Sequence, residues 1–346
     1  MQRAADRRTR KEDPLMTVAQ PQRSAAMIAS IADPGVRTTR APFGDALVKA
    51  AEADPRIVGL AADLAKYTDM HVFARAFPDR FFQMGMAEQV MMAAAAGMAE
   101  VGQIPFAATY SVFATRRAYD FLCLDMAEPG LNVNIVAALP GLTTGYGPSH
   151  QATEDVAILR GMPGLTIVDP CDAVDIEQAV PQLAAAPGPS YTRLLRGAVP
   201  RILDDYDYSF ELGKAKLVRP GDDAVFVSSG LMTMRGLLAA EQLAKRGIDV
   251  AVVHCATLKP FDEETVLAQI AGDRPVFTLE NHSVIGGLFE TVAAALARRG
   301  IGEKVVPIAL PDEFLAAGAL PTLHDRYGIS TNAVTDRVRK ELSARA

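Results

Sequence analysis

Residues 81–97 read FFQMGMAEQVMMAAAAG, an apolar stretch in which Glu88 is the one acidic side chain. The run that follows Glu88 is typical of a buried helix. Burying an unpaired carboxylate is costly, so Glu88 needs an explanation. Either it lies in the first helical turn, where the helix dipole favours a carboxylate and Gly85 supplies the preceding turn, or its apolar surroundings favour the neutral acid, which can share a proton with a ligand.

The composition is that of a globular protein that binds small molecules or other proteins. A chain of 346 residues is long enough for two domains of roughly 150 residues each. Hydrophobic residues make up 49% and charged residues 22% of it, as in ordinary globular domains. A net charge of −6 gives no electrostatic footprint for nucleic acid or an anionic membrane.

The cysteines indicate a reducing compartment. Cys123, Cys171 and Cys255 are far apart, odd in number and free of metal-ligand spacing. The longest apolar run, Val90 to Ala99, has about half of the roughly 20 residues that a membrane span needs. We therefore expect a cytoplasmic protein without a transmembrane helix.

The N-terminus has no signal-peptide pattern. Its first fifteen residues mix basic and acidic side chains, and no apolar core follows them. We expect a disordered or extended tail over residues 1–37, with either Met1 or Met16 as the true start.

Helical and strand patterns alternate along the rest of the chain. This alternation predicts an α/β fold of two domains, each a mostly parallel sheet flanked by helices. We expect the first domain at 38–200, a linker at 201–221 and a smaller second domain at 222–346. The segments expected to be helical include 42–56, one continuous helix over 111–128, and 172–186, and those expected to be strands include 57–63, 104–110, 132–138, 190–200 and 249–258.

Several polar side chains stand where strands end. Asp63 closes a buried strand, where it is either a ligand contact or a helix N-cap. Tyr110, Phe113 and Arg117 share one face at the start of a helix, a stripe that by itself usually means core packing. His150 lies in a Gly-rich loop between a strand and a helix, which makes a functional role about as plausible as a surface position.

The order of the motifs MGMAEQ, PFAATYSVFATRRAYD, GYGPSHQATEDVAILRGMPGLTIVDP and ENHSVIGG resembles the C-terminal portion of transketolases. It is most similar to the separate C-terminal subunit of split transketolases, from about Arg40 to about Ile329. The resemblance implies a pyrimidine-binding domain for thiamine diphosphate, followed by a transketolase C-terminal domain. It also implies that Glu88 bonds to N1′ of the cofactor's aminopyrimidine and assists removal of the proton at C2 of the thiazolium.

The same resemblance implies roles for the neighbouring residues. Tyr110 and Phe113 match aromatic positions that pack against the aminopyrimidine, and Arg116 lies beside them. Asp63 matches an aspartate that helps to build the cofactor pocket at a subunit interface. His150 matches a catalytic histidine that contacts the reacting substrate oxygens and moves protons.

The substrate-binding positions depart from the familiar transketolase pattern. Arg193 matches an arginine that binds a sugar phosphate, and Arg196 offers a second cation. Tyr67, Leu139 and Tyr146 replace an expected serine, histidine and acidic residue, respectively. The resemblance therefore implies an anionic ketose that differs from the standard pentose phosphates, with Tyr67 and Tyr146 against it.

A motif is also missing. Related enzymes hold the diphosphate through Mg²⁺ with a G-D-G motif, and the nearest approach here, Gly221 to Asp223, falls in the second domain. The resemblance thus implies no metal ligand in this chain, Mg²⁺ ligands from an N-terminal partner subunit, and an α2β2 heterotetramer. Asn281 and His282 match a family motif to which we assign a structural role.

We expect a ketol-transferring subunit. The alternatives within the superfamily are a 1-deoxyxylulose-phosphate-synthase-like subunit and a 2-oxoacid dehydrogenase E1 beta-like subunit. A non-catalytic regulatory subunit is the alternative of another class. Retention of Glu88, Tyr110, Phe113 and His150 argues against it.

Overall fold

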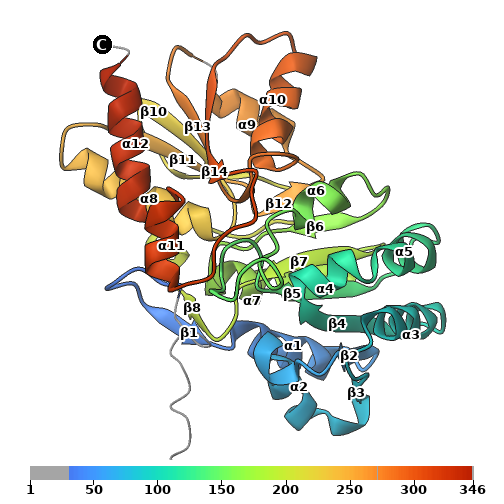
Figure 1. Cartoon of the computed structure of the whole chain (residues 1–346). Helices are drawn as coiled ribbons and strands as arrows, with labels where there is room; N and C mark the ends of the chain where they lie inside the picture. The colour runs from blue at the N-terminus through green and yellow to red at the C-terminus, as the bar shows by residue number, and fades with distance from the viewer. Residues whose placement is uncertain (1–30, 271, 345–346) are drawn as a thin grey trace, which may run out of the picture.

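A computed structural model describes residues 31–270 and 272–344, which form two stacked α/β units (Figure 1). The first has a seven-stranded sheet of order β12-β6-β7-β5-β4-β2-β3, and the second a five-stranded sheet of order β14-β13-β10-β11-β9. A two-stranded ribbon joins β1 (Thr38–Arg40) to β8 (Ala198–Pro200). Both large sheets are mostly parallel and flanked by helices, which confirms the predicted α/β class.

Strands of the first sheet are largely buried because helices cover both faces. Strand β4 has the predicted bounds, and six strands run parallel. These are β2 (Ile57–Ala61), β3 (Phe81–Gln83), β4 (Ile104–Tyr110), β5 (Asn134–Ala138), β6 (Thr166–Val168) and β7 (Ser190–Leu194).

The seventh strand comes from the second half of the chain. The strand expected at 249–258 is divided: β11 (Val250–His254) lies in the second sheet, whereas β12 (Thr257–Lys259) pairs antiparallel with β6 of the first. The prediction of one strand was wrong because the chain crosses between two sheets within a single apolar run.

Helices of the first unit include α3 and α4, which carry Glu88 and Phe113. The helices of this unit are α1 (Pro42–Ala53), η2 (Ala65–Thr68), α2 (Met70–Ala76), η3 (Pro78–Arg80), α3 (Glu88–Glu100), α4 (Ser111–Arg116), α5 (Tyr119–Phe121), the π-helical η4 (Leu122–Ala127), α6 (Asp155–Arg160), α7 (Ala173–Ala185) and η5 (Leu203–Asp205). The continuous helix expected over 111–128 was wrong, because Ala118 leaves the helical region at φ −119° and ψ 11°.

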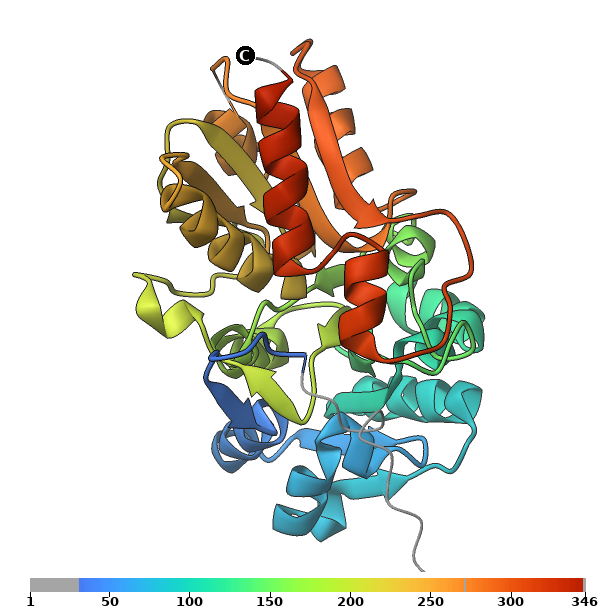
Figure 2. The same ribbon diagram turned by 60° about the vertical axis from the view of Figure 1, so that its left-hand side comes forward.

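The second unit repeats the alternation around its own sheet. Strand β9 is antiparallel to β11, and the other neighbours are parallel. Helix α12 packs along α8 and ends near the C-terminus (Figure 2). The remaining elements are β9 (Lys216–Arg219), β10 (Ala224–Ser228), α8 (Leu231–Ala244), α9 (Glu263–Ile270), β13 (Val276–Ser283), α10 (Leu288–Arg298), β14 (Val305–Leu310), α11 (Leu320–Arg326) and α12 (Thr331–Ser343).

The expected tail and linker are tied to the core where the structure describes them. Residues 1–30, with the alternative start Met16, lie outside the described residues, but Ile31 is buried in the core. In the linker, Phe210 is buried and Tyr208 Oη donates to Asp175 Oδ1 at 2.5 Å. These contacts tie residues 206–210 of the predicted linker to α7 of the first unit.

Candidate active site

Glu88 begins helix α3, directly after the turn that follows β3. Gly85 in this turn has φ +69°, a conformation that glycine adopts without strain. The carboxyl group is buried, and both of its oxygens lie 3.3 Å from Nη1 of Arg117. Glu88 therefore has the position at the helix start that the first interpretation requires, and also the burial that the second requires.

Arg117 is the cation next to Glu88. Its guanidinium lies 4.0 Å from the centre of the Phe113 ring, a cation–π contact, while its side chain stays half exposed. Arg116, which we expected beside the cofactor, instead donates from Nε to Glu154 Oε1 at 2.5 Å and from Nη1 to Pro148 O. Helical spacing already placed Arg117 on one face with Tyr110 and Phe113, and this signal could have identified it as a site residue.

Aromatic rings extend the site from Phe113. The Tyr110 ring lies 5.8 Å from that of Phe113, and the His150 ring lies 5.6 Å from Phe113 and 6.0 Å from Tyr110. Tyr146 lies 5.4 Å from His150. Burial, with a smaller effect of Arg117, lowers the pKa of His150, which favours a neutral imidazole. The structure thus brings together residues from β4, α4 and the Gly-rich loop.

Arg196 adds a positive charge at the far side of this cluster. Its guanidinium carbon lies 5.8 Å from the Tyr67 ring centre and 6.0 Å from that of Tyr110. Within the described part of the chain, neither Arg196 Nε nor Tyr146 Oη has a hydrogen-bond partner, although both atoms are buried. Unsatisfied buried polar atoms are costly, so these two atoms fit a ligand that is anionic and rich in oxygen.

Arg193 does not belong to this site. It is buried, and donates from Nε and Nη2 to Asp155, from Nη1 to Asp169 and from Nη2 to the carbonyl of Asn281. The expectation that Arg193 binds a sugar phosphate was wrong, because two carboxylates from other elements already take up its donors. Arg193 instead joins the two units.

Asp63 lies at the edge of the site in a left-handed conformation, with φ +56°. Its side chain is exposed, and its backbone N–H donates to Gln83 Oε1 at 2.7 Å. The residue at the cap position of η2 is Leu64. This excludes the N-cap interpretation, and contact with a cofactor stays a prediction.

The arrangement fits the aminopyrimidine half of thiamine diphosphate. The tilted rings of Tyr110 and Phe113 can hold a planar heterocycle. Arg117 connects these rings to a buried carboxyl, because it contacts both the Phe113 ring and Glu88. In residues 31–270 and 272–344, no group of three or more His, Cys, Asp or Glu side chains is placed to hold a metal ion. Over the same residues, no helix is both long and apolar enough to cross a membrane.

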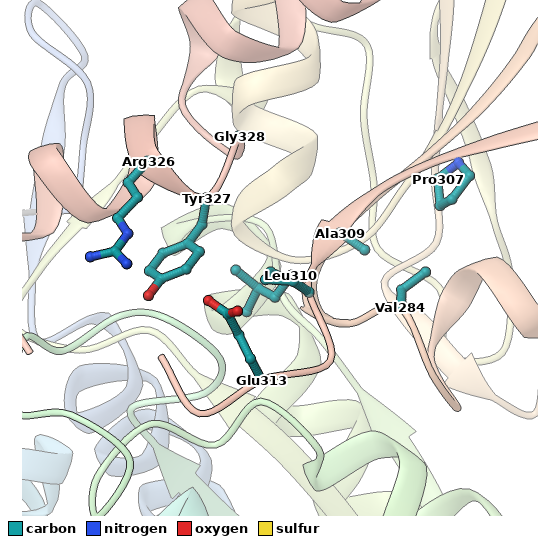
Figure 3. Close-up of a pocket in the computed structure, with 9 residues that line it drawn as sticks. Val284, Pro307, Ala309, Leu310, Glu313, Arg326, Tyr327 and Gly328 are labelled. Carbon is teal, nitrogen blue, oxygen red and sulfur yellow. The ribbon is translucent and has the colours of Figure 1, made fainter. Parts of the chain in front are cut away.

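A separate pocket of about 480 Å³ lies in the second unit (Figure 3). None of the expected site residues contributes to its walls. It is lined by Val284, Pro307, Ala309, Leu310, Pro311, Glu313, Arg326, Tyr327 and Gly328.

Two family models match the chain. The model described as transketolase, pyrimidine binding domain, matches residues 36–201, and the transketolase C-terminal domain matches residues 213–334. The first range contains Glu88, Tyr110, Phe113, Arg117 and His150, and the second contains the strands of the five-stranded sheet.

Similar proteins are known in sequence and in structure. A putative uncharacterized transketolase family protein of Sinorhizobium fredii is 59% identical, over 97% of this chain and 99% of the relative. A 6-deoxy-6-sulfo-D-fructose transketolase subunit of a Clostridium species is 39% identical, over 88% of this chain and 94% of the relative. A solved split gene transketolase, an inactive beta4 tetramer, is 39% identical with a TM-score of 0.80, over 89% of this chain and 99% of that chain.

Proposed function

Because the chain belongs to the transketolase family, we propose that it is the C-terminal subunit of a split transketolase, which transfers a two-carbon ketol unit from a ketose to an aldehyde acceptor. The observation that carries this proposal is the buried carboxyl of Glu88 at the start of α3, bonded to Arg117, whose guanidinium lies over the Phe113 ring of the Tyr110–Phe113 pair.

The residues of the site suit this chemistry. Thiamine diphosphate, when bound, supplies the electron sink for breaking and forming a bond beside a carbonyl. Tyr110 and Phe113 offer ring faces that orient a heterocycle and exclude water. The buried carboxyl of Glu88 would hydrogen-bond to a ring nitrogen of the heterocycle. His150, neutral at its lowered pKa, can accept a proton from a substrate hydroxyl or return it to an oxygen.

Substrate binding is assigned to Arg196, Tyr67, Tyr146 and His150. The unpartnered Nε of Arg196 favours a ketose with a phosphate or sulfonate group. The Clostridium relative, whose name specifies a sulfonated fructose, supports an anionic substrate outside the standard pentose phosphates. Tyr67 and Tyr146 are larger than the serine and the acidic residue expected at these positions, and each still offers a hydroxyl group to the substrate.

The partner is an N-terminal transketolase subunit, which we infer completes the site with the Mg²⁺ and diphosphate ligands in an α2β2 assembly. Exposed apolar side chains on and beside α3 and on η4, which contact one another, support a protein contact here: Met86 is 82%, Val90 57% and Leu124 58% exposed. Large exposed apolar side chains of this kind mark interaction sites. The three cysteines are free, which suits a reducing, cytoplasmic location.

The test is an assay of the complex reconstituted with the N-terminal subunit. Donors are xylulose 5-phosphate, 6-deoxy-6-sulfofructose and an unphosphorylated ketose, with ribose 5-phosphate as acceptor. Arg196→Met should lower kcat/KM for the anionic donors by roughly 10- to 100-fold, the worth of a charged hydrogen bond, and leave the neutral donor unaffected. Arg201→Met, which removes surface ion pairs in the same unit, is the matched control.

Two results would count against the proposal. A complex that transfers no ketol unit, but joins pyruvate to glyceraldehyde 3-phosphate, would favour the synthase-like alternative. Equal losses for anionic and neutral donors in Arg196→Met would remove Arg196 from the anion site.

A further inference from the structure

The Gly-rich loop at residues 139–151, which carries Tyr146 and His150, is attached to the second unit along much of its length. Gly145 O accepts a hydrogen bond from Gly318 N at 3.0 Å. Gln151 Nε2 donates to Ala316 O at 3.2 Å. A Cβ atom added to Gly145 would overlap Gly318 O, so the two backbones meet without room for a side chain. The loop therefore depends for its position on a unit that supplies no ring of the cluster.

Leu142 ties this loop to the second unit through both of its backbone polar groups. It is fully buried, so both of its backbone polar groups need partners inside the protein. Its N–H donates to Asn281 Oδ1 at 2.9 Å, and its carbonyl lies 2.7 Å from His324 Nε2. Side chains from β13 and α11 thus bond to one loop residue from both sides.

The hydrogen bonds around His324 define its tautomer. Arg235 Nη2 lies 2.7 Å from His324 Nδ1. A guanidinium can only donate, so Nδ1 must accept, and the ring proton must lie on Nε2. This is the tautomer that can donate to Leu142 O. Burial, followed by the charge of Arg235, lowers the pKa of His324 to about 3, so the ring stays neutral near pH 7.

We propose that His324 is a positioning residue for the substrate loop: held in one tautomer by Arg235, it bonds to Leu142 and thereby places Tyr146 and His150 over the Tyr110–Phe113 pair. The inference rests on the proposed function in taking this loop to bind substrate. It gives the second unit a part in the reaction, although the described rings of the cluster all come from the first unit.

Two amide variants separate positioning from general stability. In His324→Gln the amide nitrogen reaches the place of Nε2 and can still donate to Leu142 O. In His324→Asn the side chain ends near the place of Nδ1 and cannot reach the loop. Both variants replace an imidazole by an uncharged amide and lose ring packing. His324→Asn keeps an acceptor for Arg235 and loses the bond to Leu142, whereas His324→Gln keeps the bond to Leu142 and loses the acceptor for Arg235. Only loss of the Leu142 bond is expected to loosen the loop.

Backbone hydrogen–deuterium exchange, followed by mass spectrometry on the full chain, is the first readout. Peptides from residues 142–151 should exchange about tenfold faster in His324→Asn and close to the wild-type rate in His324→Gln. Peptides covering β10 should be unchanged in both. Equal loop protection in the two variants would overturn the proposal, as would faster exchange across β10 to the same degree as in the loop.

The second readout uses the complex with the N-terminal subunit. His324→Asn should lower kcat/KM about tenfold, mainly through KM, and leave hydrogen–deuterium exchange at the cofactor C2 at the wild-type rate, since Glu88 is not moved. If ketol transfer and C2 proton exchange were lost together, His324 would have a structural role only. The exchange measurement on the free chain needs neither cofactor nor substrate, so it decides the positioning role even if the proposed reaction is wrong.

Discussion

Replacing Glu88 by Gln separates the chemical role of this carboxyl from its structural role. The variant keeps the shape of the side chain at the start of α3 and removes the group that can titrate. Its cost in stability comes from the contact with Arg117, where both carboxylate oxygens lie 3.3 Å from Nη1. Arg117 is 51% exposed and keeps its place over Phe113, so water can solvate the released cation. Because only the cation is exposed, we expect a cost of about 1 kcal/mol, the upper end of the range for exposed pairs.

The chemical effect should be much larger. If the carboxyl shares a proton with the aminopyrimidine, its loss should slow exchange of the cofactor C2 proton by about 10² or more, the range of general acid–base catalysis. The assay is exchange of this proton into deuterium oxide, stopped with acid and read by nuclear magnetic resonance, on the complex with the N-terminal subunit. Glu100→Gln, at the exposed other end of α3, should exchange at the wild-type rate.

Exchange of the C2 proton in Glu88→Gln as fast as in the wild type would exclude this role of the carboxyl. So would a loss of several kcal/mol for this variant in urea unfolding, because Glu88 would then be a structural residue whose removal slows the reaction indirectly.

Three further predictions concern the rest of the chain. Isothermal calorimetry should show weak binding of thiamine diphosphate with Mg²⁺ to the isolated chain, which should not turn over; tight binding and full activity alone would contradict the split site. Arg193→Met should lower the free energy of unfolding by about 3–5 kcal/mol, because it leaves Asp155 and Asp169 buried without a cation, against less than about 1 kcal/mol for Arg201→Met. Burial raises the pKa of Asp69 to about 6, so the stability it contributes is present below its unfolded pKa near 4 and is lost as pH rises through 6. Relative to Asp69→Asn, the wild type should lose up to roughly 3 kcal/mol between pH 4 and pH 7 in urea unfolding; a pH-independent difference would refute this.

Local sequence patterns were enough to predict much of the fold correctly. The apolar run Ile104–Tyr110 is a strand with these bounds, and Glu88 starts its helix after the Gly85 turn. Because the carboxyl ends of parallel strands meet at one edge of a sheet, the side chains that follow β4 and β5 come together at the site. Helical spacing at the end of β4 and along α4 was enough to associate Tyr110, Phe113 and Arg117.

Contacts between residues far apart in the sequence could not be predicted from local patterns. Nothing near Arg193 in the sequence shows that Asp155 and Asp169 surround it. The crossing of β12 into the first sheet likewise depends on its pairing with β6, about ninety residues earlier. The break at Ala118 occurs within a good helical pattern, and the helix that resumes at Tyr119 changes to the π-helical η4 at Leu122.

Two arginines three residues apart show how a ligand-binding cation is distinguished from a structural one. Arg193 lies in the buried strand β7, and its Nε, Nη1 and Nη2 atoms all donate to the protein. Arg196 lies beyond the end of this strand, where its Nε has no partner among the described residues and its guanidinium lies near the Tyr67 and Tyr110 rings. A cation whose donors are satisfied by the fold cannot bind an anion without breaking those bonds, whereas an unsatisfied donor gains from one. The anionic end of the substrate is therefore expected beside Tyr67 and Tyr110, and not at the centre of the sheet where the sequence motif alone placed it.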